Sequence, residues 1–296
     1  MATDQQQLVA DITALLGTFR SAGDWQDFAP LEWFAELLAK HEIPPDGFDH
    51  RFLAALAYSG WFLFCAGSLT PKFHRRRMLV DVQNWDAVAA FTRFQDLPTD
   101  VKPIKPKPLR KRLMHVFEAS SPLVLELASD YEATLQRTNA FQTATHGRSW
   151  IEPEFAAALC ELADTPVQIG GSLVQTIAWD LRDLDTCELV AADVGYKVGA
   201  VYSSISGFSD RRFPSLGIVQ LFAQLEVMQS AGIAIWDLGM PMDYKYGLGA
   251  GEATGQQWLQ VLHGCRDSNV SFPTSPTALT SLAGLRQLHS HLVHGR

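Results

Sequence analysis

The chain has 296 residues, 47% of them hydrophobic, and a formal net charge of −8. This length suits one large or two ordinary domains with a sizeable core. The four cysteines lack Cys-x-x-Cys spacing, which argues against a zinc ribbon and a disulfide scaffold. With no signal peptide and no apolar run long enough to span a bilayer, we expect a cytoplasmic protein.

The charge is unevenly distributed along the chain. Residues 72–112 carry eleven lysines and arginines against four aspartates, a local charge of +7. Such a segment is typical either of contact with a polyanion or of a solvated surface with a Lys-Pro linker. If the first interpretation holds, the expected phosphate-contacting side chains are Lys72, Arg75, Arg76, Arg77, Lys105, Lys107, Arg110 and Lys111.

The first third of the chain has a mainly helical pattern. Apolar residues recur at helical spacing over 5–20 and 31–40, and a short helix is expected to begin near Phe52. A strand is expected at 78–82. Prolines alternate with lysines over 101–109, which is typical of an extended linker. We therefore expect an N-terminal domain over 1–108 and a second domain over 109–296.

The second domain alternates strands and helices. We expect a strand at 123–127, a helix over about 130–138, and a helix opening at Trp150–Phe155 with Pro153 in its first turn. Alternation predicts a strand over 172–179, and a charged turn over 180–186 follows it.

Residues 188–250 have the most informative pattern. Two β-rich runs, 188–194 and 197–204, surround a predicted turn at Gly195–Tyr196, and a loop is expected over 205–209. A helix follows and stops at Gly232, and then a buried strand ends at Asp237. Open α/β sheets place ligands at the carboxyl ends of strands, so Asp237 is a candidate site residue. After Ala250 we expect helices over 254–264 and 277–292.

Several stretches, taken in order, resemble the leucyl/phenylalanyl-tRNA–protein transferase family. They are Leu56–Phe62, Arg77–Val80, Leu109–Lys111, Ser149–Phe155, Glu188–Val190, Val201–Ser209 and Leu248–Ala250. Residues 203–204, 215–217 and 243–245 are also similar to the C-terminal half of arginyl-tRNA–protein transferases. The resemblance implies a smaller, mainly helical N-terminal domain followed by an α/β fold with a GNAT-like mixed sheet flanked by helices.

The resemblance also implies a reaction of the N-degron type. The α-amine of a protein attacks the ester that joins an amino acid to tRNA, and a peptide bond forms. Aminoacyl-tRNA is then a co-substrate and protein N-termini are the acceptors. No other cofactor, metal, DNA or membrane is implied, and we expect a monomer. Two motifs depart from the family: its Glu-Ser-Met is Ile205–Gly207 here, and its Asp-x-Gln is Asp237–Gly239.

Site residues are carried over position by position. Asp237 is the expected general base, and Tyr244 and Lys245 are expected to contact the ester or the terminal phosphates. Each has a structural alternative, a strand-end cap for Asp237 and surface positions for the other two. The expected substrate-binding side chains are Trp150, Ser204, Ser206, Phe208 and Met240, for which core packing or a turn is the alternative.

Two other functions remain open. A GNAT N-acetyltransferase shares the expected fold, but residues 211–217 lack the spacing of its pyrophosphate-binding turn. The second is a non-catalytic module of the same fold that binds tRNA or protein N-termini, because two polar groups of the family are missing. Turnover with charged tRNA separates this module from an enzyme.

Overall fold

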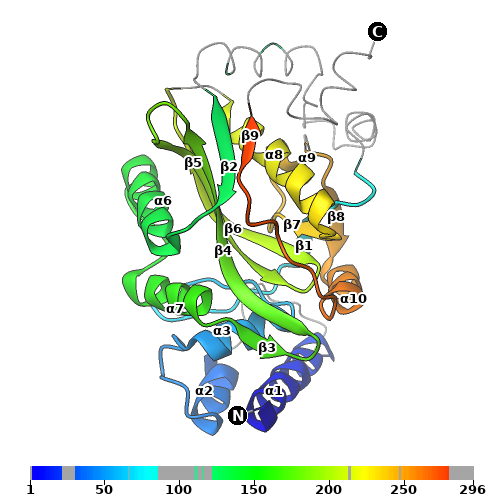
Figure 1. The fold of residues 1–296 in the computed structure, drawn as a ribbon. Coiled ribbons are helices and arrows are strands. Elements are labelled where there is room, and N and C mark those ends of the chain that lie inside the picture. The colour runs from blue at the N-terminus through cyan, green and yellow to red at the C-terminus, as the bar shows by residue number, and fades with distance from the viewer. Residues whose placement is uncertain are drawn as a thin grey trace.

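The described residues form one mixed sheet with helices on both faces (Figure 1). The computed structural model describes residues 2–21, 31–65, 67–85, 111, 116, 122–212, 215–246 and 248–279. In chain order the strands of this part are β1 (Arg76–Asp81), β2 (Leu123–Leu127), β3 (Val167–Ile169), β4 (Ser172–Asp183), β5 (Leu189–Val198), β6 (Val201–Ser209), β7 (Ile235–Asp237), β8 (Gly251–Thr254) and β9 (Thr277–Leu279).

The helices pack around this sheet in three groups. Figure 1 shows α6 and α7 on one side of the sheet and α8 on the other, with α1–α3 gathered at one end. Their bounds are α1 (Ala2–Ser21), α2 (Leu31–Lys40), α3 (His50–Tyr58), α6 (Tyr131–His146), α7 (Pro153–Asp164), α8 (Leu216–Ala231), α9 (Asp243–Tyr246) and α10 (Gly255–Cys265).

The expected fold class is confirmed. The strand order is β8-β1-β7-β6-β5-β4-β2-β9, with β3 pairing on β4. Strands β4, β5 and β6 form an antiparallel meander, α8 crosses over, and β7 returns parallel to β6. This is the hairpin–helix–strand order that the GNAT-like expectation required. A tight turn can join only antiparallel strands, so the parallel strands β6 and β7 need a crossover connection such as α8.

Two apolar clusters fill the two faces of the sheet. One joins α1–α3 and α7 to the β5 side chains Val194 and Tyr196. The other lies under α8 and includes Trp179 of β4 and Trp236 of β7. Because the N-terminal helices share a cluster with the sheet, their apolar faces are buried by the second half of the chain.

Strand β1 belongs to the same sheet as the C-terminal strands. It lies between β7 and β8 and pairs antiparallel with both. The expected N-terminal domain therefore contributes a strand to the sheet of the second domain. The predicted boundary at 108/109 lies outside the described residues and stays a prediction.

The hairpin is present, but its turn is at a different position. Gly195 lies inside β5, and the chain reverses at Gly199, which has a φ of +57°, and Ala200. Gly195 is needed for close approach instead, because a Cβ there would lie 2.3 Å from the carbonyl oxygen of Ser203. The expected loop at 205–209 is the second half of β6.

Three further expectations are corrected. The turn predicted over 180–186 begins later, since β4 continues to Asp183. The helix predicted over 130–138 runs to His146 and ends at Gly147, which has a φ of +80°. Residues 277–279 form β9 rather than a helix start, and the rest of that predicted helix lies outside the described residues. The pairing of β9 with β2 overrides the helical pattern of the local sequence over these three residues.

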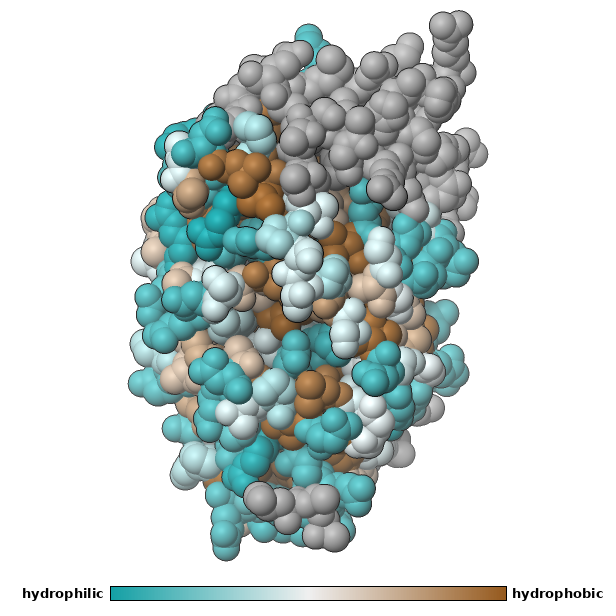
Figure 2. Space-filling view, viewed as in Figure 1, coloured by the Kyte–Doolittle hydropathy of each residue, from teal (hydrophilic) through white to brown (hydrophobic). Residues whose placement is uncertain are grey.

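The surface drawn in Figure 2 mixes polar and apolar side chains. Within the described ranges no helix is both long and apolar enough to cross a membrane.

Candidate functional site

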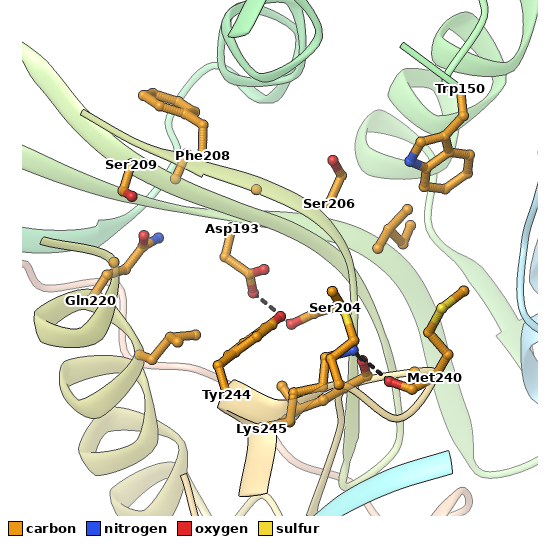
Figure 3. A pocket seen from close by; sticks show the side chains of 18 of the residues that line it. Trp150, Asp193, Ser204, Ser206, Phe208, Ser209, Gln220, Met240, Tyr244 and Lys245 are labelled. Atoms are coloured by element: carbon orange, nitrogen blue, oxygen red, sulfur yellow. Dashed lines mark hydrogen bonds between the residues drawn. The ribbon is translucent and has the colours of Figure 1, made fainter. Parts of the chain in front are cut away.

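A pocket opens where β6 and β7 separate. The two strands pair in parallel over three residues, ending with Ser203 opposite Asp237. Beyond that point β6 continues to Ser209, while the chain after β7 turns away through residues 238–245. The space between them has a volume of about 540 Å³ (Figure 3). The sequence-predicted side chains that line it are Trp150, Ser204, Ser206, Phe208, Met240, Tyr244 and Lys245.

A carboxylate that the sequence analysis did not single out lies in this pocket. Asp193 projects from β5 toward Ser204 and Tyr244 in Figure 3. Its Oδ2 accepts hydrogen bonds from Tyr202 Oη at 2.8 Å, Ser204 Oγ at 2.8 Å and Gln224 Nε2 at 3.0 Å. Burial raises the pKa of Asp193 to about 6, although these three hydrogen bonds and the Lys245 charge oppose the shift.

Lys245 holds the segment that forms the other wall. Its Nζ donates to the carbonyl oxygens of Leu238 and Met240. Burial lowers the pKa of Lys245 to about 8, against the attraction of Asp237 and Asp193. The ammonium therefore fixes the loop after β7 and contributes positive potential to the pocket. Tyr244 is half exposed at the rim, and burial with the nearby Asp193 raises its pKa to about 12, so its hydroxyl stays protonated.

One end of the pocket is aromatic. Trp150 stacks on Phe64, with ring centroids 5.4 Å apart, and lies 6.2 Å from Phe62. At the other end Phe208 packs against Phe141 at 5.5 Å. This leaves apolar surfaces on both sides of the polar group formed by Asp193 and its donors.

His74 adds a neutral ring to the pocket wall. It is buried and packs against Phe62, with centroids 4.9 Å apart. Burial, followed by the charges of Arg77, Lys72 and Lys245, lowers the pKa of His74 to about 2. Its imidazole is therefore uncharged at neutral pH. Across the residues that the structure describes, no three His, Cys, Asp or Glu side chains come together as metal ligands.

The expected placement of Asp237 at the cleft is wrong. Asp237 is fully buried and does not line the pocket. Its carboxylate pairs with Arg77 and also accepts hydrogen bonds from Ser203 Oγ and the Gly239 amide. Asp237 therefore anchors the end of β7, which is the strand-end cap given above as the structural alternative to a catalytic role. Its neighbours in sequence, Leu238 and Gly239, are the ones that reach the pocket.

Arg77 is likewise misplaced by the sequence prediction. Its guanidinium is fully buried, donates to the Gly60 carbonyl oxygen at 3.0 Å, and lies 4.3 Å from the Trp258 ring centroid. It therefore cannot contact a phosphate on the surface. Of the other basic candidates, Arg75, Arg76 and Lys111 are exposed and Lys72 is half-buried. Lys105, Lys107 and Arg110 lie outside the described residues.

Sequence reasoning missed Asp193, although a signal was present. Asp193 is a charged residue in the apolar run Val190–Val194, and a charge in a buried strand needs partners or a function. The resemblance drew attention to positions 205 and 237 instead. The structure supplies the carboxylate from β5, one strand away from Ile205.

A second cavity of about 720 Å³ lies between α6 and α7. Its lining includes three carboxylates, from Glu132, Glu161 and Asp164, together with Cys160 and Ile151. None of the sequence-predicted site residues reaches it. We therefore place the candidate site in the smaller pocket, where the polar and aromatic candidates meet.

Comparison with known proteins gives little beyond this geometry. No protein-family model matches the sequence, and no curated protein matches it. Among solved structures, one similar chain is the C-terminal domain (DUF2156) of a protein assigned as a lysylphosphatidylglycerol synthetase from Agrobacterium fabrum. The identity is 14%, the TM-score is 0.36, and the match covers 90% of this chain and 78% of that one. This likeness is too distant to carry an argument about the site.

Proposed function

We propose that the protein transfers an aminoacyl group from aminoacyl-tRNA to the α-amine of a protein or peptide. The observation that carries the proposal is the pocket at the separation of β6 and β7. The pocket has the chemical groups that this reaction requires, and it lies within the stretch that resembles aminoacyl-tRNA–protein transferases.

The open edge of β6 supports an acyl-transfer site. Beyond Ser203, β6 has no β7 partner, so its backbone groups on that side border the pocket. Backbone amides at an open strand edge bind extended acyl or peptide groups by main-chain hydrogen bonds. Fixed amides also stabilise the negative charge that develops on an ester oxygen under attack. An ester is already activated, so orientation and oxyanion stabilisation supply much of the rate.

The apolar surfaces have complementary roles in this proposal. Trp150 at one end provides a ring face for the terminal base, since base–aromatic stacking contributes roughly 1–3 kcal/mol. Phe208 and Met240 contact the side chain of the aminoacyl group. Ser206 and the hydroxyl of Tyr244 bind its polar atoms. The exposed Arg75, Arg76 and Lys111 and the half-buried Lys72 remain the candidates for phosphate contacts on the described surface.

The direct test uses the purified full-length chain. It is incubated with total tRNA charged with a mixture of isotopically labelled amino acids and with peptides that differ in their N-terminal residue. We expect a mass increase of one amino-acid residue on a subset of peptides, and no increase on N-acetylated peptides. A parallel incubation with acetyl-CoA controls for acetyl transfer. Absence of aminoacyl product from every peptide, or an acetyl product instead, would contradict the proposal.

A further inference from the structure

We propose that Asp193 is the catalytic base of the pocket, binding the attacking amine through its Oδ1 atom and accepting its proton. This inference rests on the proposed function, because that function supplies the amine and the ester. Asp193 takes the role of general base that the sequence analysis assigned to Asp237, which is buried away from the pocket.

The geometry leaves one oxygen of Asp193 available. Tyr202, Ser204 and Gln224 all donate to Oδ2. Among the described residues no hydrogen-bond partner is found for Oδ1, and Oδ1 is not among the fully enclosed polar atoms. A carboxylate accepts at both oxygens, so Oδ1 retains its full capacity for a ligand. The side chain is thus held at one oxygen and open at the other.

The three donors are themselves fixed by the fold. Ser204 Oγ accepts a hydrogen bond from Trp236 Nε1 at 2.9 Å while it donates to Asp193. Tyr202 is fully buried, and Gln224 reaches across from α8. Each donor therefore holds the carboxylate from a rigid element, which limits its motion toward other orientations. We identify Ser204, Gln224 and Tyr202 as positioning residues.

Space for a ligand lies beside Asp193. The residue directly opposite it on β6 is Gly207. Asp193 and Gly207 both line the pocket, so the space beside the carboxylate is part of that cavity. A Cβ on Gly207 would lie 2.6 Å from the Ala192 carbonyl oxygen, so a larger residue does not fit without a shift.

The electrostatics suit a base that works near neutral pH. Burial raises the pKa of Asp193 toward that of the amine it must deprotonate, while its three hydrogen bonds and the ammonium of Lys245 keep it from rising further. The other titratable groups facing it are the hydroxyls of Tyr202 and Tyr244, whose raised pKa values keep them neutral. At neutral pH the carboxylate is therefore mostly ionised and can accept a proton.

The proton transfer balances without a further reactant. The amine nitrogen forms a bond to the ester carbonyl carbon, and the bond from that carbon to the tRNA ribose oxygen breaks. One proton moves from the nitrogen to Asp193 Oδ1 and then to the departing ribose oxygen. The products are an amide and free tRNA, and Asp193 is regenerated as a carboxylate.

The test is Asp193→Asn, which keeps the shape of the side chain. The amide oxygen can occupy the Oδ2 position and accept the same three hydrogen bonds, so the fold is retained. We expect kcat to fall by roughly 10²–10⁴-fold with little change in KM for the peptide. Protonation of the amine lowers the rate of both proteins at acidic pH. Protonation of Asp193 should make the wild-type rate fall more steeply below about pH 6, and this additional fall should disappear in the variant. The control is Asp180→Asn, a buried aspartate on β4 that bonds to Thr134 and Arg182 away from the pocket.

Two outcomes would overturn the assignment. The first is an Asp193→Asn variant with wild-type kcat and the same steep fall in rate below about pH 6. The second is an Asp193→Asn variant that keeps kcat but has a raised KM for aminoacyl-tRNA, with no such rise in KM when the aminoacyl group is N-acetylated. That result would place the amine of the donor, rather than the attacking amine, at Asp193. If the wild-type chain transfers nothing, the proposed function fails and this inference with it. If the wild-type chain transfers amino acids and Asp193→Asn transfers them equally well, the inference fails while the proposed function stands.

Stability provides a readout that needs no substrate. A raised carboxyl pKa stabilises the fold fully below pH 3.8, and this contribution is lost as pH rises through about 6. Replacing Asp193 by asparagine removes that penalty. Relative to wild type, Asp193→Asn should therefore gain unfolding free energy between pH 5 and pH 7.5. Urea denaturation at the two pH values measures this gain. The same difference in unfolding free energy between variant and wild type at both pH values would contradict a buried carboxylate with a raised pKa.

Discussion

Two buried aspartates in the same sheet differ in what surrounds them. Asp237 is neutralised by the guanidinium of Arg77 and has no access to the pocket. Asp193 is held by three uncharged donors, with Lys245 nearby, and one of its oxygens borders the pocket. Breaking a buried ion pair leaves an uncompensated charge, whereas a carboxylate held by neutral groups keeps its ability to accept a proton.

This contrast predicts that Asp237→Asn is a stability mutation. Loss of the carboxylate charge leaves the Arg77 guanidinium buried without a counter-ion, and such changes cost roughly 3–5 kcal/mol. Urea denaturation should show this loss. The control is Arg76→Ala, whose side chain is 67% exposed and pairs with Glu252, and it should cost less than about 1 kcal/mol. An Asp237→Asn variant with wild-type stability and no transfer would restore Asp237 as the base.

At the scale of elements, an irregularity in the β5–β6 hairpin shapes the site. The pairing register shifts between Val194 and Gly195, so that Ile205 has no partner on β5. Bulges of this kind bend a strand and are frequent next to active sites. Here the bulge lies between Ser204, which bonds to Asp193, and Ser206, which also lines the pocket.

Gly195 is the residue that this element depends on. In Gly195→Ala the new Cβ would lie 2.3 Å from the Ser203 carbonyl oxygen and 2.6 Å from Tyr202 Oη. The hairpin must shift, which we expect to cost about 1–3 kcal/mol. Thermal denaturation measures the loss. As a control, Gly264→Ala in α10 meets no atom within 4 Å and should stabilise the helix by roughly 0.5–1 kcal/mol. A Gly195→Ala variant as stable as Gly264→Ala would show that the close approach is not required.

At the scale of the whole molecule, the N-terminal elements and the sheet are joined at two places. Helix α3 shares an apolar cluster with α7 and β5, and β1 lies between β7 and β8. The buried Arg77–Asp237 pair adds a link between β1 and β7 across 160 residues. Elements that share a core are expected to unfold together.

We therefore predict one unfolding transition for the described part of the chain. Tryptophan fluorescence and far-UV circular dichroism should give coincident unfolding curves in urea. Trp61 and Trp236 lie in the two apolar clusters on the two faces of the sheet, so the fluorescence reports on both. A protease-resistant fragment beginning near residue 109, or two separated transitions, would contradict this and support two independent domains.

The sequence by itself determined most elements, because helical and strand periodicity are local properties of the chain. The expected fold class came from the order of those elements together with the family resemblance. The resemblance singled out Trp150, Ser204, Phe208, Met240 and Lys245, which line one pocket in the structure, while their roles stay predictions. Only the tertiary structure decided which carboxylate reaches that pocket. Burial depends on partners distant in sequence: Gln224 holds Asp193 from 31 residues away, and Arg77 encloses Asp237 from 160. The turn was misplaced for the same reason, since Gly195 is required by a neighbouring strand rather than by its own local conformation.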